Sequence, residues 1–178
     1  CEEKENDVFL STKEGKCLRF PISNVRKFTG RNSVGVRGIR LSKDDTVISM
    51  YILKHAKFTI DERNDYLKIA NSIRRKELRR SMPYSKLSKE TRLSEEKFNE
   101  MENMEEFILS VADNGYGKRS SAYQYRITSR GGKGIANMAV SKKTGKVVSS
   151  FPVNEKDDVM LITGAGRLIR SPVNKIRI

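Results

Sequence analysis

The sequence predicts an all-β chain built from repeated propeller-like blades, with one inserted α-helical segment. The first observation is a pattern that occurs three times: a short apolar run, a glycine turn, and an arginine four residues beyond the glycine. The copies are centred on Gly15, Gly115 and Gly166. The second observation is their spacing, since 51 residues separate the last two glycines, the length of one blade, whereas 100 separate the first two. The first interval therefore holds one repeat plus an insertion, and a single repeat cannot bury its sheet face without a neighbour.

The repeats divide the chain into four expected regions. We expect a first blade over residues 1–53, an inserted charged helical segment over residues 54–106, a second blade over residues 107–156 and the truncated start of a third blade over residues 157–178. The first residue is cysteine rather than methionine, and the third copy stops in mid-repeat. Both ends are therefore expected to be cuts in a longer protein.

The first blade contains three strand signals. Residues 8–19 predict a hairpin with a turn at residues 13–16, and Pro21 ends the ladder because it has no N–H to donate. Residues 34–41 alternate apolar residues with glycine or arginine at the strand period of two. Residues 46–53 are rich in β-branched side chains, which favour another strand.

The segment between the blades has a helical pattern instead. Residues 60–80 contain no glycine or proline and place apolar residues near helical spacing, while Ser94 and the acids after it predict the N-terminus of a second helix. Pro83 separates the two helices. The segment also carries a basic cluster, which suits either a contact with DNA or RNA or a solvated helix face, and the neighbouring acids favour the solvated face. Its members are Arg74, Arg75, Lys76, Arg79 and Arg80.

The second blade repeats the strand signals of the first. Asn114 followed by glycine is a strong hairpin-turn signal, residues 125–128 alternate as a strand does, and residues 143–146 form another turn before residues 147–148. Residues 157–178 begin the same sequence of elements again.

The charge of the chain points to a polyanionic partner. The sequence has 36 Lys and Arg against 22 Asp and Glu, a net charge of +14. The inserted segment contributes +2 and the blades the remaining +12. The blades are therefore the basic part of the protein.

Other functional classes lack their residues in this sequence. Two cysteines and one histidine cannot supply a disulfide framework or a zinc site, so no metal site is expected. No apolar run approaches 18 residues and no signal peptide is visible, so a cytoplasmic setting without a membrane span is expected. One histidine and no Ser-His-Asp set predict no catalytic residues, and the acidic pairs at residues 44–45 and 157–158 occupy turn positions.

A glycine-rich motif at residues 129–134 has the composition of a phosphate cradle. Its glycines allow close approach of a backbone, and Arg130 and Lys133 add positive charge. It is not a P-loop, because the spacing of that motif is missing and Ile135 stands where the hydroxyl that holds Mg²⁺ would be. A loop between two strands of a blade explains the glycines equally well, so both interpretations stay open.

A basic position recurs once in each repeat, at Arg19, Arg119 and Arg170. Such repetition predicts a stripe around the rim of a propeller, where a bent DNA duplex would place its phosphates. We therefore expect double-stranded DNA to be bound through its phosphates with little reading of the bases. The expected contacts are Arg31, Arg37, Arg40, Lys118, Arg119, Arg130, Lys133 and Arg170.

Residues 113–119, 31–40 and 158–163 resemble the C-terminal domain of the bacterial DNA gyrase A subunit, and the resemblance covers residues 7–53 and 107–178. It implies a β-pinwheel, a six-bladed disc whose basic perimeter bends and wraps DNA. It further implies an ATP-dependent type II topoisomerase that introduces negative supercoils, with two A and two B subunits in the bacterial cytoplasm on the chromosome. The ATP and Mg²⁺ of such an enzyme are used outside this region, so no cofactor is expected in it.

The match to the signature box of that family, Gln-Arg-Arg-Gly-Gly-Lys-Gly, is partial. Residues 130–134 agree, whereas Thr128 and Ser129 replace the leading pair, so the true box is expected upstream. The alternatives are the related domain of the topoisomerase IV A subunit, which lacks the box, and a basic propeller that recruits proteins. An RNA-binding module is a weaker alternative, because few aromatic residues accompany the basic positions. The inserted segment has no counterpart in this resemblance.

Overall fold

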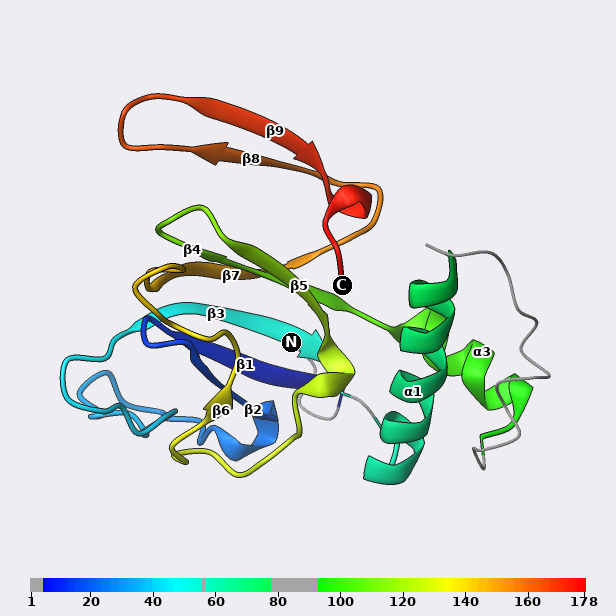
Figure 1. Ribbon diagram of the computed structural model, residues 1–178. Helices are drawn as coiled ribbons and strands as arrows, with labels where there is room; N and C mark the ends of the chain where they lie inside the picture. Colours follow the sequence, from blue (N-terminus) through cyan, green and yellow to red (C-terminus); the bar gives the residue numbers. More distant parts are fainter. Residues whose placement is uncertain (1–4, 56, 78–92) are drawn as a thin grey trace. The chain divides into compact units, whose positions relative to one another are not determined.

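The computed structural model describes residues 5–55, 57–77 and 93–178, and the chain forms two compact units (Figure 1). One unit comprises residues 1–55 and 106–178, which include the three repeats. The other comprises residues 56–105. We describe each unit by itself.

The first repeat forms most of a four-stranded antiparallel sheet. Strands β1 (Asn6–Thr12), β2 (Lys16–Pro21) and β3 (Val47–Lys54) are joined by the short strand β6 (Ile135–Ala136), in the order β3-β1-β2-β6. The predicted hairpin over residues 8–19 is confirmed. Strand β1 lies between two partners and is buried along almost its whole length, which explains its apolar residues on both faces.

The second and third repeats begin with the same hairpin. Strands β4 (Phe107–Ala112), β5 (Gly117–Ser121) and β7 (Val147–Val153) form a sheet in the order β5-β4-β7, and β8 (Asp158–Ile162) pairs with β9 (Leu168–Pro172). Each hairpin turns at a glycine with φ between 76° and 81°, a conformation that side chains with a Cβ rarely adopt. A short 3-10 helix follows each hairpin: η1 (Ile22–Asn24), η3 (Ala122–Gln124) and η4 (Val173–Lys175).

The second repeat donates strand β6 to the sheet of the first repeat. Ile135 pairs with Cys17 in β2, and the amide of Thr128 donates to the carbonyl of Arg19 at 2.9 Å. The strand predicted at residues 125–128 is wrong, because this segment forms an isolated parallel bridge to β2 rather than a ladder. The chain crosses from the second repeat to the first within this segment, so its residues have different neighbours along its length.

The strand predicted at residues 34–41 is also wrong. This segment forms no strand, and the side chain of Val34 is fully exposed. A strand is stable when a neighbouring strand satisfies its N–H and C=O groups. In the second repeat, β6 pairs with β2. Residues 34–36 of the first repeat have no strand beside them in the described part of the chain.

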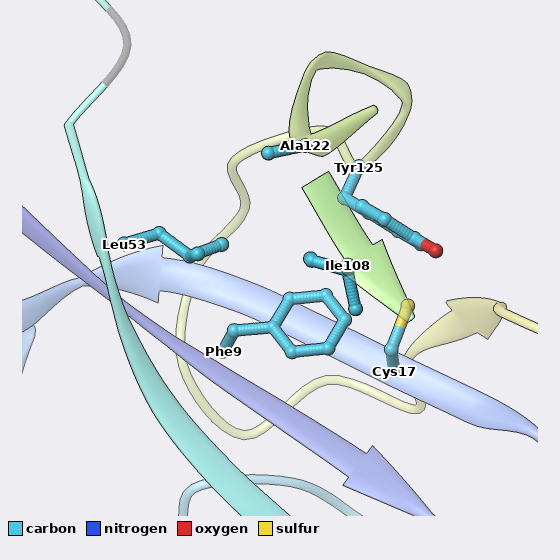
Figure 2. Close-up of a cluster of buried hydrophobic side chains, with 6 residues drawn as sticks. All are labelled: Phe9, Cys17, Leu53, Ile108, Ala122 and Tyr125. Atoms are coloured by element: carbon cyan, nitrogen blue, oxygen red, sulfur yellow. The ribbon is translucent and has the colours of Figure 1, made fainter. Parts of the chain in front are cut away.

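Two apolar cores join neighbouring repeats. Figure 2 shows one core, in which Phe9 of the first repeat lies against Tyr125 of the second, with ring centroids 5.0 Å apart at an interplanar angle of 69°. Leu53, Ile108, Ala122 and Cys17 complete it. A further core joins the second repeat to the third through Leu109, Val153, Val159 and Val173. This sharing bears out the expectation that a repeat buries its sheet face against a neighbour.

The inserted unit is helical, with α1 (Ile60–Glu77) and α3 (Glu95–Met104). The predicted N-cap is confirmed, since the hydroxyl of Ser94 accepts from the amide of Lys97 at 3.3 Å. Tyr66 packs against Phe98 with ring centroids 5.0 Å apart, and its hydroxyl donates to Glu105 at 2.8 Å. Residues 78–80 of the predicted first helix, with two arginines of the basic cluster and Pro83, lie outside the described residues.

Candidate nucleic-acid interface

Two long stretches of the sheet unit carry positive charge without any acidic residue. Residues 15–43 and residues 114–154 contain no aspartate or glutamate. Within them lie two loops, residues 25–43 and residues 125–134, which we call the first and second basic loops. The exposed basic residues of the loops are Arg26, Lys27, Arg31, Arg37, Arg40, Lys43, Arg126 and Lys133.

Backbone hydrogen bonds hold the two basic loops together. The amide of Gly131 donates to the carbonyl of Gly38 at 2.6 Å, and the amide of Arg40 donates to the carbonyl of Gly132 at 2.8 Å. Two loops far apart in the sequence are therefore adjacent in the fold. Among the predicted contacts, Arg31, Arg37, Arg40, Arg130 and Lys133 lie in these two loops.

Arg130 is half-buried and bonds to protein rather than projecting into solvent. Its Nε donates to the carbonyl of Asn24 at 3.0 Å, and its Nη1 donates to the carbonyl of Arg37 at 2.7 Å. The glycines beside it also serve the loop. Gly131 has φ of 83°, and a Cβ on Gly134 would lie 2.7 Å from the carbonyl oxygen of Cys17. The geometry thus favours the interpretation of residues 129–134 as a packed inter-strand loop.

Lys118 is exposed at the start of β5, outside the two loops. Its ammonium donates to the carbonyl of Asn137 at 2.8 Å, which leaves two further N–H donors on the same group. Its charge also acts on the buried thiol of Cys17. Burial raises the pKa of Cys17 to about 12, and the nearby ammonium opposes that shift.

The recurring arginine does not form a rim stripe, and this prediction is corrected. Arg19 is 2% exposed, and its Nε donates to the fully buried Asp7 at 2.7 Å. Its Nη1 donates to the carbonyl of Ala122 in the next repeat at 2.9 Å, and its Nη2 to the carbonyl of Lys54 at 2.7 Å. Asp7 also bonds His55 Nδ1 at 2.6 Å. The first copy of the arginine therefore joins two repeats.

Arg119 occupies the same place in the second repeat and is 5% exposed. Phe107 stands where the first repeat has Asp7, and the guanidinium lies 5.1 Å from the centroid of its ring. Glu155 accepts from Arg119 Nη1 at 3.3 Å. A phosphate contact at Arg119 is therefore at odds with its burial.

Arg170, the third copy, pairs with Asp158 as Arg19 pairs with Asp7. Its Nε donates to Asp158 Oδ2 at 2.8 Å, but its side chain is 71% exposed. Arg170 thus keeps the aspartate partner within its hairpin. It differs from Arg19 because, among the described residues, no neighbouring repeat covers it. The same residue type at the same register is buried or exposed according to what packs upon it.

Several exposed basic residues of the loops were not predicted as contacts. Arg26, Lys27, Lys43 and Arg126 lie in the loops among the predicted residues. The predicted contacts came from the recurring arginine motif, the glycine-rich motif and the three short segments that resemble the family, and these four residues lie outside all of them. The missing signal was the absence of acids over residues 15–43 and 114–154.

The described residues offer no metal site and no membrane span. Across residues 5–55, 57–77 and 93–178, no group of three or more His, Cys, Asp or Glu side chains could hold a metal ion. None of the helices in these ranges is long and apolar enough to cross a membrane.

The sequence of this chain matches a known protein family and several known proteins. A family model described as the DNA gyrase C-terminal domain, beta-propeller, matches residues 6–54, 106–154 and 157–178 and leaves out the helical insertion. The chain is 48% identical to the DNA gyrase A subunit of Rickettsia bellii over 178 residues, which is all of this chain and 19% of that protein. It is 31% identical to the DNA gyrase A subunit of Escherichia coli K12 over 174 residues, 98% of this chain and 14% of that protein.

A solved structure supports the fold. The C-terminal domain of DNA topoisomerase IV matches with a TM-score of 0.63 at 17% sequence identity, covering 97% of this chain and 39% of that one. Identity this low is informative about fold alone, and with the family match it confirms the predicted all-β blade architecture. The chain spans about a fifth or less of the length of the gyrase subunits it matches.

Proposed function

Since the chain belongs to the family of DNA gyrase C-terminal β-propeller domains, we propose that its two basic loops bind double-stranded DNA and help to wrap it. The observation that carries the proposal is the pairing of these loops. Two acid-free segments from different repeats are hydrogen-bonded to each other, and both carry exposed arginines and lysines. A duplex carries one charge per ~1.7 Å along its axis, which such a surface can neutralise at several points.

The binding is proposed to depend on phosphates rather than on base sequence. The exposed groups are cationic side chains on loops, and no helix of the sheet unit longer than a single 3-10 turn is described that could enter a major groove. Phosphate contacts position a protein on DNA without reading its sequence. Affinity should therefore fall steeply with salt and vary little between DNA sequences.

The role of the whole protein follows from its relatives. We propose that the chain is part of the A subunit of a DNA gyrase, an ATP-dependent type II topoisomerase that supercoils DNA negatively and contains two A and two B subunits. The names of the relatives and the family match support this assignment. Strand cleavage, ATP hydrolysis and the Mg²⁺ site are proposed to lie outside this chain, and the location is proposed to be the bacterial cytoplasm.

A second candidate is the corresponding domain of a topoisomerase IV A subunit, since a solved C-terminal domain of DNA topoisomerase IV shares the fold. The sequence comparison favours gyrase, because the two gyrase subunits described above are 48% and 31% identical to this chain. Under both candidates, the two basic loops would bind DNA.

The test is a measurement of DNA linking number. Relaxed circular plasmid is mixed with increasing amounts of the protein, a nicking-closing enzyme is added, and topoisomers are counted after the protein is removed. A dose-dependent shift supports wrapping. Salt-sensitive binding without a shift supports DNA binding and rejects chiral wrapping by this chain. Binding that is insensitive to salt would contradict the phosphate interface and favour a module for protein interaction.

A further inference from the structure

The second basic loop holds the first at two points through a single side chain. Arg130 donates one N–H to the carbonyl of Asn24, at the base of the first loop, and another to the carbonyl of Arg37 within that loop. We propose that Arg130 is a positioning residue, which holds the first basic loop in its DNA-binding conformation and does not itself bind a phosphate. This proposal rests on the proposed function above.

The first loop has few other means of keeping its shape. No strand or helix is described over residues 25–43, and residues 25–37 are all exposed, so no apolar core orders them. Its basic residues also repel one another, and no acid lies within the loop to offset that repulsion. Ile39 anchors the later part of the loop in an apolar core, so we expect the order of residues 25–37 to depend on the hydrogen bonds to the second loop.

Those hydrogen bonds come from three consecutive residues. Arg130 supplies two through its side chain, Gly131 donates one to Gly38, and Gly132 accepts one from Arg40. The backbone pair anchors the loop at its later part. The bonds of Arg130 extend the anchoring back to Asn24, and so enclose the segment that carries Arg26, Lys27 and Arg31.

The geometry is specific to arginine. A guanidinium is planar and holds several N–H donors in a fixed fork, so it can reach two carbonyls at 3.0 and 2.7 Å together. A lysine ammonium keeps the charge but is a single point on a flexible stem, and it cannot reproduce both bonds. Substitution by lysine therefore separates positioning from charge.

The experiment compares Arg130→Lys and Arg130→Gln with Arg167→Lys, in the full chain. Arg167 is exposed in the turn between β8 and β9, outside both basic loops, so it is a matched control for the change of side chain at equal charge. Amide hydrogen exchange is measured without DNA over residues 25–39, with residues 8–10 of β1 as a check on the fold. DNA binding is then measured as a function of salt.

We expect Arg130→Lys and Arg130→Gln to increase exchange over residues 25–39 and to weaken DNA binding by about tenfold, the loss of a few phosphate contacts at moderate salt. Arg167→Lys should change neither. Lys133→Gln should weaken binding with exchange unchanged.

Two results would overturn the proposal. The first is that Arg130→Lys keeps wild-type exchange and affinity while Arg130→Gln loses affinity, because Arg130 would then act by charge. The second is faster exchange over residues 25–39 with unchanged affinity, because the loop would then need no fixed conformation. Failure of the proposed function is a separate outcome: the wild-type chain would not bind DNA, and the positioning role in DNA binding would be rejected with it, whatever the exchange data show about loop order. Protection of residues 8–10 in the milder Arg130→Lys variant excludes global unfolding as the cause of any change.

Discussion

Replacement of Arg19 by methionine tests whether the recurring arginine is structural. Methionine keeps an unbranched apolar stem and has no charge, so the variant leaves the carboxylate of Asp7 in a fully buried site without its guanidinium partner. It also removes the donors to the carbonyls of Lys54 and Ala122, which lie 2.7 and 2.9 Å from the guanidinium. We expect the fold to lose stability while the DNA-binding loops keep their charges.

The size of the effect follows from burial. Removal of one partner of a buried ion pair costs about 3–5 kcal/mol, because the other charge stays buried without compensation. Each carbonyl that loses its donor adds about 1 kcal/mol. His55 still bonds to Asp7 at 2.6 Å and offsets part of the loss. We therefore expect the free energy of unfolding to fall by about 3–5 kcal/mol.

The assay is urea denaturation of the chain followed by circular dichroism and tyrosine fluorescence, which suits a protein with six tyrosines and no tryptophan. Arg170→Met is the matched control, since this copy has the same aspartate partner with 71% of its side chain exposed. An exposed ion pair contributes less than about 1 kcal/mol, so the control should lose no more than that. Replacement of both Asp7 and Arg19 by apolar residues should restore much of the stability.

The reasoning is refuted if Arg19→Met loses less than about 1 kcal/mol. It is also refuted if that variant keeps its stability and loses affinity for DNA, because Arg19 would then contact phosphate as a rim residue. Equal losses in Arg19→Met and Arg170→Met would show that burial by the next repeat does not determine the effect.

Three further predictions follow from the same structure. Lys118→Glu should weaken binding to all DNA sequences and lower the slope of affinity against salt by about one unit. Arg119→Glu should instead reduce stability, because its carboxylate would be buried near Glu155. Salt titrations of DNA binding and urea melts distinguish the two effects, and equal effects of both variants on binding would contradict the burial of Arg119. Gly134→Ala should destabilise the chain more than Gly115→Ala in urea melts. Both glycines have positive φ, but of the two only Gly134 has a backbone oxygen within 3 Å of the new Cβ. Equal losses of stability would show that the backbone moves away from the new Cβ without cost. Burial raises the pKa of Cys17 to about 12, so the unfolded thiol ionises first and stability falls as pH rises from about 9 to 12. Burial also raises the pKa values of Tyr66 and Tyr125, which adds to the fall above about pH 10. Cys17→Ala should therefore reduce the fall in stability between about pH 9 and 10 in urea melts, and an unchanged fall in that window would assign it to another group.

Local patterns were sufficient to predict the hairpins. The strand pairs around Gly15, Gly115 and Gly166 formed as expected, since a glycine turn and flanking apolar runs act over a dozen residues. The N-cap at Ser94 was likewise a local matter. Strand β6 was not predictable in the same way, because its partner Cys17 belongs to another repeat.

The candidate interface could likewise be predicted only in part from the sequence. The excess of basic residues in the blades is a property of composition, and it is enough to indicate a polyanionic partner. Which basic residues face solvent is not a property of composition. Arg31, Arg37 and Lys133 are exposed as predicted, whereas Arg119 is buried and Arg130 bonds to backbone carbonyls.

Local patterns along the chain were enough to predict the repeats, their hairpins, the helical insertion and the location of positive charge in the blades. The role of each arginine depends instead on contacts between segments that are distant in the sequence. Arg19 binds partners 12, 35 and 103 residues away, and the most distant of them belongs to the next repeat. A guanidinium is structural when such groups surround and desolvate it, and it is free to bind phosphate when they do not. Neither surrounding is encoded next to the arginine, so three copies of one motif have different roles.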